Sequence, residues 1–450
     1  MSGDAPAPER HPFARHPHRT LVELSIPVML SLIAEPLTGL VDTAFVARLG
    51  ATPLAALGVG TVLLSGTLWI FNFLGVGTQS EVAHALGARD DARGREVSGV
   101  AIALSLAVGA VLALLLWPLL GPITRALGAT AAIESDAVTY LEIRLLGAPA
   151  VIVTLATFGS LRGLHDMRTP LYIAAGSNAL NAGLDALLIT GAGPIPGFGI
   201  AGAAWATTAS HWIGAALGIA AVRARIGLPD RLSFQHAGAL LVIGRDLFLR
   251  TALLVAFIAL GTREATRLGS EAGAAHQAVR QVWLLTALAL DAFAASAQSL
   301  VGSFLGAGDT PLARRVAGVA VAWSIGTGLV LGLAMLALED LAARALTPPS
   351  ARELFAAAWW VAALAQPLNA VSFATDGIHW GTRDYRYLRN AMLCASAAGG
   401  ALLLGADALG RASLPGVWLV TALWIALRSG LGVLRVWPGV GRAPLAPISR

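Results

Sequence analysis

The chain has 450 residues, of which 56% are hydrophobic and only 13% are charged, and its mean hydropathy is +0.70. A soluble protein of this length could not bury so much apolar surface, so the composition predicts a polytopic membrane protein. The net charge of +5 comes from arginines spread among short connections, which excludes a nucleic-acid-binding stripe, and the single cysteine excludes an intrachain disulfide and a CxxC-type metal site.

The first apolar stretch, residues 21–48, is long enough to cross a bilayer, which takes about 20 residues. Asp42 lies inside this run, where a carboxylate costs at least about 2.5 kcal/mol. Because such a residue is usually tolerated only when it faces a bundle interior or a water-filled cavity, Asp42 is a candidate functional residue. Pro27 and Pro36 interrupt the hydrogen-bond ladder of the same helix and predict that it bends.

Further apolar stretches follow, separated by glycine, proline and charge. They cover residues 54–80, 97–120, 137–161, 170–190, 200–222, 240–268, 275–303, 316–338, 353–378, 388–405 and 414–434. The sequence therefore predicts an all-α polytopic membrane protein with about twelve transmembrane helices. Alternate connections differ in arginine content, and those on the side of the N-terminus hold most of it, so we expect both termini to be cytoplasmic.

An internal repeat joins the two halves of the chain. RLGATPLAA at Arg48 recurs as RLGSEAGAA 219 residues later, and QSEVAHALGARD at Gln79 recurs as QSLVGSFLGAGD at the same offset. The segment 163–165 also resembles 377–379, at a slightly different spacing. We expect two pseudo-symmetric six-helix lobes of equal topology, related by an axis along the membrane normal. The predicted parts are a cytoplasmic tail 1–20, an N-lobe 21–222, a cytoplasmic linker 223–239, a C-lobe 240–437 and a cytoplasmic tail 438–450.

Polar residues of the first half coincide in depth. Asn178, Asn181 and Asp185 are spaced three and four apart, so they share one helix face. Asp42, Asp185 and Thr207 lie at similar distances from the outer ends of their helices, at 1.5 Å per residue. Two carboxylates, an amide oxygen and a hydroxyl at one depth predict a site for a hard cation or a proton. The alternative is that Asp42 and Asp185 belong to separate structural pairs.

The second half carries different polar residues. Asp291 corresponds by the repeat to Asn72, and polar residues at matched positions predict a substrate cavity between the halves, while pairing of Asp291 with Arg280 is the alternative. We expect Asp376 to anchor a loop at a helix end and Arg144 to be structural. Tryptophans near predicted helix ends are expected to anchor the membrane interface; they are Trp359, Trp360, Trp418 and Trp437.

Motifs for other chemistry are incomplete. Asp90 and Asp91 resemble half of an aspartate-rich prenyl-diphosphate motif, but no second such motif follows. The sequence has no Walker loop, HExxH or GxSxG. We therefore expect no enzyme activity, no ATP-driven transport by this chain alone, and no cofactor other than a coupling ion.

Several segments together resemble the multidrug and toxic compound extrusion (MATE) transporters, and specifically their DinF-like branch. The resemblance covers residues 21 to about 437 and is carried by SIPVML, VDTAFVARLG, PLAALGVG, the LGARD loop, LRGLHDMRTP, NALNAGLD and GIAGAAWAT. It implies a MATE-type fold of two six-helix lobes around a central cavity, which exchanges drugs or organic metabolites for Na⁺ or H⁺.

The resemblance also implies site residues. By motif, the cation site falls on Asp42, Asn181, Asp185 and Thr207, and the bending proline of the first helix is Pro27. A tyrosine that the family places four residues before Asp42 is Thr38 here, a change that favours H⁺ over Na⁺. Around Leu254 and Gln366 we find none of the C-lobe acids of the NorM-like branch, which favours the DinF-like assignment.

The sequence thus predicts a cation-coupled antiporter that exports small organic, cationic or amphipathic substrates by alternating access. We expect a monomer in the bacterial inner membrane, with the lipid bilayer and the substrate as partners and with no metal except Na⁺ at the predicted site. Two alternatives remain: a lipid or lipid-linked oligosaccharide flippase of related fold, and an intramembrane prenyltransferase-like enzyme.

Overall fold

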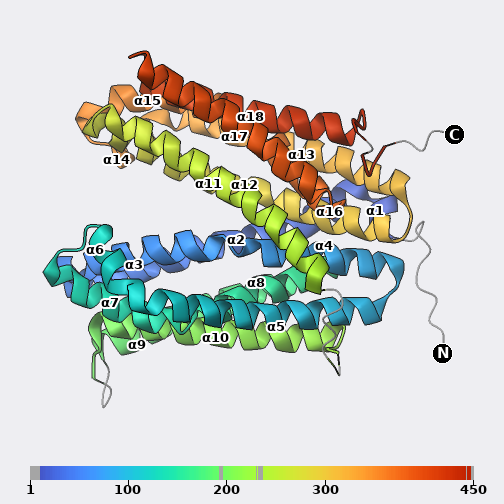
Figure 1. Ribbon diagram of the computed structural model, residues 1–450, viewed down its shortest axis with the longest axis horizontal. Coiled ribbons are helices and arrows are strands. Elements are labelled where there is room, and N and C mark those ends of the chain that lie inside the picture. The colour runs from blue at the N-terminus through green and yellow to red at the C-terminus, as the bar shows by residue number, and fades with distance from the viewer. Residues whose placement is uncertain (1–10, 192–195, 230, 232–236, 442, 447–450) are drawn as a thin grey trace. The chain divides into compact units, whose positions relative to one another are not determined.

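The computed structural model describes residues 11–191, 196–229, 231, 237–441 and 443–446. Parts of the predicted tails and linker, namely 1–10, 230, 232–236, 442 and 447–450, lie outside the described residues. The described chain is almost entirely helical, as predicted (Figure 1). It divides into two compact units, which we name the N-unit (Leu30–Gly244) and the C-unit (Met1–Met29 with Arg245–Arg450).

The first half of the chain supplies the helices of the N-unit. They are α1 (Pro12–Arg15), α2 (Pro17–Val46), η2 (Ala47–Leu49), α3 (Ala51–Trp69), α4 (Asn72–Ala88), α5 (Asp91–Leu116), η3 (Trp117–Leu119), α6 (Leu120–Ala126), α7 (Ala131–Leu145), α8 (Ala148–Gly163), α9 (Arg168–Thr190) and α10 (Gly199–Arg225), of which α1 and the start of α2 belong to the C-unit. Within the N-unit, α9 packs along α10, and α8 packs against α4 and α5 (Figure 1).

The second half of the chain forms most of the C-unit. Its helices are α11 (Ala237–Arg267), α12 (Ser270–Gly306), α13 (Thr310–Ala337), α14 (Glu339–Leu346), η4 (Pro349–Ala351), α15 (Arg352–Leu364), α16 (Gln366–Gly381), α17 (Tyr385–Ala408) and α18 (Leu414–Val436). Here α16 packs against α12, α13 and α18. The C-unit therefore surrounds α16 with longer helices.

The helices account for the predicted membrane spans. Among the described residues, seven helical segments are long and apolar enough to cross a membrane, and the bent pairs α7–α8 and α15–α16 raise the number to nine. The helices α9, α10 and α11 are 23, 27 and 31 residues long but carry more polar and charged residues. Each of the predicted apolar stretches coincides with one of these helices or pairs, so the prediction of about twelve helices is confirmed.

Matching aspartates begin matching helices in the two halves. Asp90 caps α5 by accepting a hydrogen bond from the Arg93 N–H at 3.0 Å, and Asp309 caps α13 by accepting one from the Leu312 N–H at 2.9 Å. An aspartate at this position satisfies a backbone donor that the helix leaves open. Asp90 therefore has a structural role, and no diphosphate motif is needed to explain it.

Close approaches between helices show that one pair of residues in the predicted repeat was misaligned. A Cβ atom on Gly163 would lie 2.8 Å from the Gln79 carbonyl oxygen, and one on Gly381 would lie 2.7 Å from the Gln298 carbonyl oxygen. Because the two glutamines are equivalent in the repeat, the structure pairs Gly163 with Gly381. Pairing it with Gly377, as the short sequence similarity suggested, was wrong by one helical turn, since the close backbone approach decides which glycines correspond.

The first membrane helix begins in one unit and ends in the other. Residues up to Met29 belong to the C-unit, where the Ser25 hydroxyl contacts the Ser296 hydroxyl at 3.0 Å, and the rest of α2 belongs to the N-unit. These units differ from the predicted lobes 21–222 and 240–437 in where the start of this helix belongs. Helix α2 is unbroken through Pro27 and Pro36, so bending at these prolines stays a prediction.

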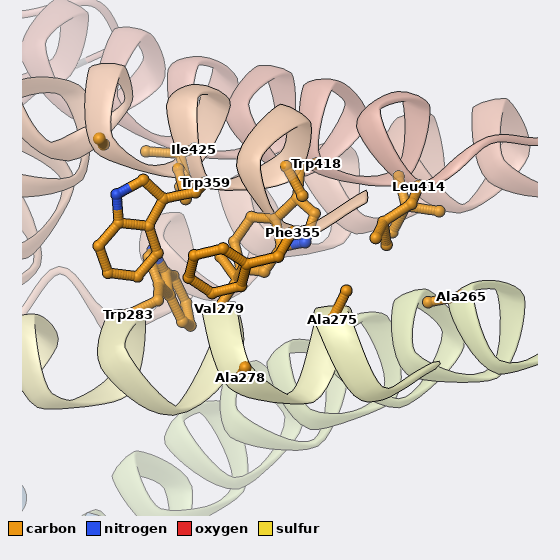
Figure 2. Close-up of a cluster of buried hydrophobic side chains, with 14 of the residues drawn as sticks. Ala265, Ala275, Ala278, Val279, Trp283, Phe355, Trp359, Leu414, Trp418 and Ile425 are labelled. Carbon is orange, nitrogen blue, oxygen red and sulfur yellow. The ribbon is translucent and has the colours of Figure 1, made fainter. Parts of the chain in front are cut away.

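The core of the C-unit corrects the assignment of two tryptophans. Figure 2 shows Trp283 of α12, Phe355 and Trp359 of α15 and Trp418 of α18 packed together in this cluster. Trp359 is 1% exposed, stacks on Phe355 and donates to the Met335 carbonyl at 2.8 Å. Trp359 and Trp418 are core residues rather than interfacial anchors, because the helix faces that carry them are covered by neighbouring helices. Trp360, by contrast, is exposed.

Candidate functional site

Four of the predicted site residues meet inside the N-unit. Asp42 comes from α2, Asn181 and Asp185 from α9, and Thr207 from α10, and all four are buried. The Asn181 amide nitrogen donates to the Thr207 hydroxyl at 3.3 Å, and this hydroxyl lies 3.2 Å from an Asp42 carboxylate oxygen. Spacing along α9 places Asn181 and Asp185 on the face that α10 covers. The three helices thus bring two carboxyl groups into one polar cluster.

Several side-chain oxygens of this cluster are buried without a hydrogen-bond donor. Oδ1 of Asp42, Oδ1 of Asn181 and both carboxylate oxygens of Asp185 are buried and accept no hydrogen bond from another described residue. The Asp42 and Asp185 carboxyl groups are close enough to interact with each other. Two ionised carboxylates in one buried site repel each other, and a proton or a bound cation relieves this repulsion. The cluster is therefore suited to bind a proton or an oxygen-coordinated cation.

The Thr207 hydroxyl links the cluster to its own helix. It lies 2.9 Å from the Ala203 carbonyl as well as 3.2 Å from Asp42. A hydroxyl has one hydrogen and can donate to one of these acceptors at a time. When it donates to Ala203, a contact with Asp42 requires that Asp42 carry the proton. The position of this hydrogen therefore depends on the ionisation of the carboxyl group.

Two further predicted residues lie one turn before the cluster. The Asn178 amide nitrogen donates to the Ala34 carbonyl of α2 at 2.8 Å, and the Thr38 hydroxyl donates to the same carbonyl at 3.1 Å. The Asn178 bond fastens α9 to α2 close to Pro36, which has no N–H to support the helix, whereas the Thr38 bond lies within α2. The structure thus places both side chains against the Ala34 carbonyl, and their role as ion ligands stays a prediction.

A charged and aromatic set on α7 and α10 adjoins the cluster. Arg144 is close enough to Asp42 and Tyr140 to act on both electrostatically, and it contacts Nδ1 of His211 at 3.3 Å. Because arginine only donates, this histidine nitrogen accepts, and Nε2 carries the histidine hydrogen. The structural role expected for Arg144 stays a prediction. An arginine within a membrane helix is a functional candidate by default, as Asp42 was, and this rule would have found it.

The bend between α7 and α8 brings the end of α7 against side chains of α10. The two helices meet at 45°, which leaves the last carbonyls of α7 without helical donors. The Thr208 hydroxyl donates to the Ile143 carbonyl at 3.1 Å, and the Trp212 indole donates to the Leu146 carbonyl at 3.0 Å. Side chains of α10 therefore satisfy two carbonyls at the end of α7.

The remaining predicted residues are not part of this cluster. Asn72 is the first residue of α4, and Asp291 lies half-buried within α12. The guanidinium of Arg280 bonds to Gln277 at 3.0 and 3.1 Å. Assignment of Asn72 and Asp291 to a substrate cavity stays a prediction. In the part of the chain that the structure describes, no three His, Cys, Asp or Glu side chains group as a metal site.

Asp376 differs from its predicted role. It is buried within α16 and pairs with two arginines, Arg250 of α11 and Arg428 of α18, the latter at 2.8 Å. These partners come from helices that lie far apart in the sequence. Asp376 therefore connects three helices of the C-unit, and its expected role as a loop anchor was wrong.

Comparisons with known proteins agree with the fold. The profile of the MatE family matches residues 27–187 and 247–401. Protein DETOXIFICATION 44, chloroplastic, of Arabidopsis thaliana is 32% identical over 450 residues, which cover 95% of this chain and 85% of that protein. DNA damage-inducible protein F of Escherichia coli (strain K12) is 29% identical over 428 residues, which cover 93% of this chain and 92% of that protein.

Solved structures support the same fold. A crystal structure described as MATE in the bent conformation superposes with a TM-score of 0.85 at 21% identity, over 93% of this chain and 94% of that chain. The predicted resemblance and the predicted MATE-type fold are thereby confirmed. The family profile covers both halves of the chain, and the relatives match it nearly from end to end. The chain therefore belongs to the MatE family of multidrug and toxic compound efflux transporters.

Proposed function

We propose that the protein is a cation-coupled antiporter that exports drugs or organic metabolites by alternating access. The coupling ion, H⁺ or Na⁺, binds in the N-unit at Asp42, Asn181, Asp185 and Thr207. The observation that carries this proposal is the set of buried oxygens without donors on the first three of these residues. A proton shared by the carboxyl groups, or a sodium ion held by the same oxygens, satisfies them.

Helix α2 is the element through which the ion acts on transport. It carries Asp42 in the N-unit and begins in the C-unit, so an ion that shifts Asp42 acts on a helix common to both units. The bond from Asn178 to the Ala34 carbonyl holds this helix two residues before Pro36. Ion binding favours whichever helix shape it binds more tightly, and by no more than that difference in affinity. Bending at Pro27 or Pro36 is the proposed change.

The family and the charge pattern support the setting that we propose. We place the protein in a bacterial inner membrane with both termini cytoplasmic, acting as a monomer on small cationic or amphipathic substrates. It needs the bilayer, the substrate and the coupling ion, but no other cofactor and no nucleic acid. Arginine-rich connections on the side of the N-terminus support this orientation.

Efflux from proteoliposomes tests the proposal. A panel of cationic dyes is loaded, and a pH gradient and a Na⁺ gradient are imposed in turn. We expect gradient-driven efflux that Asp42→Asn and Asp185→Asn abolish without loss of folded protein. Asp407→Asn is the matched control, because Asp407 pairs with Arg267 at 2.8 Å outside the cluster and should leave efflux unchanged.

Two results would contradict the proposal. Unchanged coupled efflux in Asp42→Asn would exclude this carboxyl as the coupling group. Lack of transport under either gradient, together with lipid scrambling by the same proteoliposomes, would favour the flippase alternative.

A further inference from the structure

A second buried polar surface lies on α16 in the C-unit. Asn369, Ser372, Asp376 and His379 are spaced three, four and three residues apart, so they follow one face of this helix. All four are at most 3% exposed. We name this set the α16 polar face. It shares no residue with the ion cluster of the N-unit and stands independently of the proposed coupling site.

Most residues of the α16 polar face carry polar atoms that lack a hydrogen-bond partner. Both amide atoms of Asn369, the hydroxyl of Ser372 and Nε2 of His379 are buried without a hydrogen-bond partner among the described residues. A buried polar group left in this state costs about 1–3 kcal/mol. So many unsatisfied groups on one helix face indicate a surface that a polar ligand completes.

The charges beside this face do not balance. Arg250 and Arg428 both pair with one carboxylate oxygen of Asp376, and their side chains are only 11% and 4% exposed. Two guanidinium groups and one carboxylate carry a net positive charge. The Nε atoms of both arginines are also buried without a partner. Because an uncompensated buried charge is strongly destabilising, a second anion would complete the group.

Both guanidinium groups are held in place by contacts other than Asp376. Arg428 lies over the Trp424 ring at 4.4 Å from its centroid, and Arg250 lies over the Trp380 ring at 5.6 Å. Such stacking retains a cation when its carboxylate partner moves away. The planar guanidinium also binds carboxylates through two parallel bonds. The arginines are therefore prepared to exchange one carboxylate for another.

A small cavity adjoins this group. It has a volume of about 10 Å³ and is lined by Asp376, His379, Tyr387 and Arg428, among others. This is room for about one water-sized atom. One oxygen of an incoming anion fits there beside Arg428, and the whole carboxylate binds when Asp376 releases an arginine.

We propose that the C-unit contains an oxyanion site in which Arg250 and Arg428 bind the carboxylate of an organic ligand in exchange for Asp376. The donors of Asn369, Ser372 and His379 extend the site along α16. The chemical class of ligand is a small organic carboxylate. An anionic lipid headgroup offers related chemistry, and the experiment distinguishes the two sources.

Isothermal titration calorimetry on the purified full chain in neutral detergent tests the site. The probes are succinate and its uncharged counterpart succinamide. We expect wild-type protein to bind succinate and not succinamide. Asp376→Asn removes the competing charge but keeps the shape, so it should bind succinate at least tenfold more tightly. Arg428→Gln and Arg250→Gln should each weaken succinate binding at least tenfold.

Asp246→Asn is the matched control. Asp246 also pairs with two arginines, Arg245 and Arg389, but these are 61% and 20% exposed, and neither lines the cavity beside Asp376. Its succinate affinity should equal that of the wild type. A merely structural role for Asp376 predicts the opposite sign, because Asp376→Asn would then weaken the fold and create no tighter site.

Four outcomes decide the proposal. Unchanged or weaker succinate binding in Asp376→Asn overturns it, as does equal binding of succinamide. Tighter binding in this variant supports it even where an arginine variant fails to fold. In neutral-lipid nanodiscs, competition by phosphatidylglycerol that depends on Arg250 supports the oxyanion site and identifies a lipid headgroup as its source.

Discussion

Two single variants, Thr207→Val and Thr208→Val, are compared to test whether ion binding depends on the Thr207 hydroxyl. The two threonines are adjacent on α10 and are 4% and 3% exposed, so valine replaces each with nearly the same shape. The Thr207 hydroxyl contacts Asn181 at 3.3 Å and Asp42 at 3.2 Å. The Thr208 hydroxyl instead donates to the Ile143 carbonyl at 3.1 Å. Only one of the two variants therefore changes the ion cluster.

The magnitudes follow from these partners. Loss of either hydroxyl leaves a buried partner without its hydrogen bond, which costs about 1–3 kcal/mol of folding free energy in both variants. Thr207→Val also removes a hydrogen bond to a carboxyl group, and bonds to charged groups contribute about 1.5–3 kcal/mol. Since about 1.4 kcal/mol corresponds to a tenfold change in affinity, ion binding should change by one to two orders of magnitude in this variant alone.

Dye efflux from proteoliposomes measures the difference. Efflux is titrated with Na⁺ at fixed pH, and with pH in the absence of Na⁺. Thr207→Val should raise the half-maximal Na⁺ concentration about tenfold or more, or shift the pH midpoint by about one unit or more. Thr208→Val should leave both midpoints at wild-type values. Equal midpoints in the two variants would refute the assignment of the Thr207 hydroxyl to the ion cluster.

Three further predictions concern stability, read as thermal unfolding in detergent. Trp359→Ala should destabilise the C-unit by about 3–5 kcal/mol, and a loss below about 1 kcal/mol would contradict its place in the core. Gly60→Ala should cost about 1–3 kcal/mol, because its Cβ would lie 2.6 Å from the buried Tyr140 ring; Gly66→Ala, with nothing within 4 Å, is the neutral control. Burial lowers the pKa of His11 from its ordinary 6.5, so the unfolded chain binds the proton first and stability should fall as pH drops below about 6.5. His11→Asn keeps an acceptor that can cap the helix, so it should reduce the fall in stability at low pH. A pH profile identical to that of the wild type would refute the role of His11.

The candidate site was partly predictable because its members follow local rules. Asn181 and Asp185 share a face through helix periodicity alone, and Asp42 stood out because a carboxylate inside an apolar run is costly. The depths of Asp42 and Thr207 could be compared because the helical rise is constant. Helix positions and the repeat were likewise readable, since apolar length and recurring motifs are properties of the chain itself.

Contacts between distant helices needed the tertiary structure. Arg144 meets His211 of α10 across 67 residues of chain. Trp418 looked interfacial from its place near a helix end, but neighbouring helices cover it. Asp376 finds Arg428 and Arg250 across 52 and 126 residues of chain. The sequence alone determined which residues form membrane helices, because apolar burial and periodicity act locally; the fold decided which polar groups meet, because that depends on how helices cross.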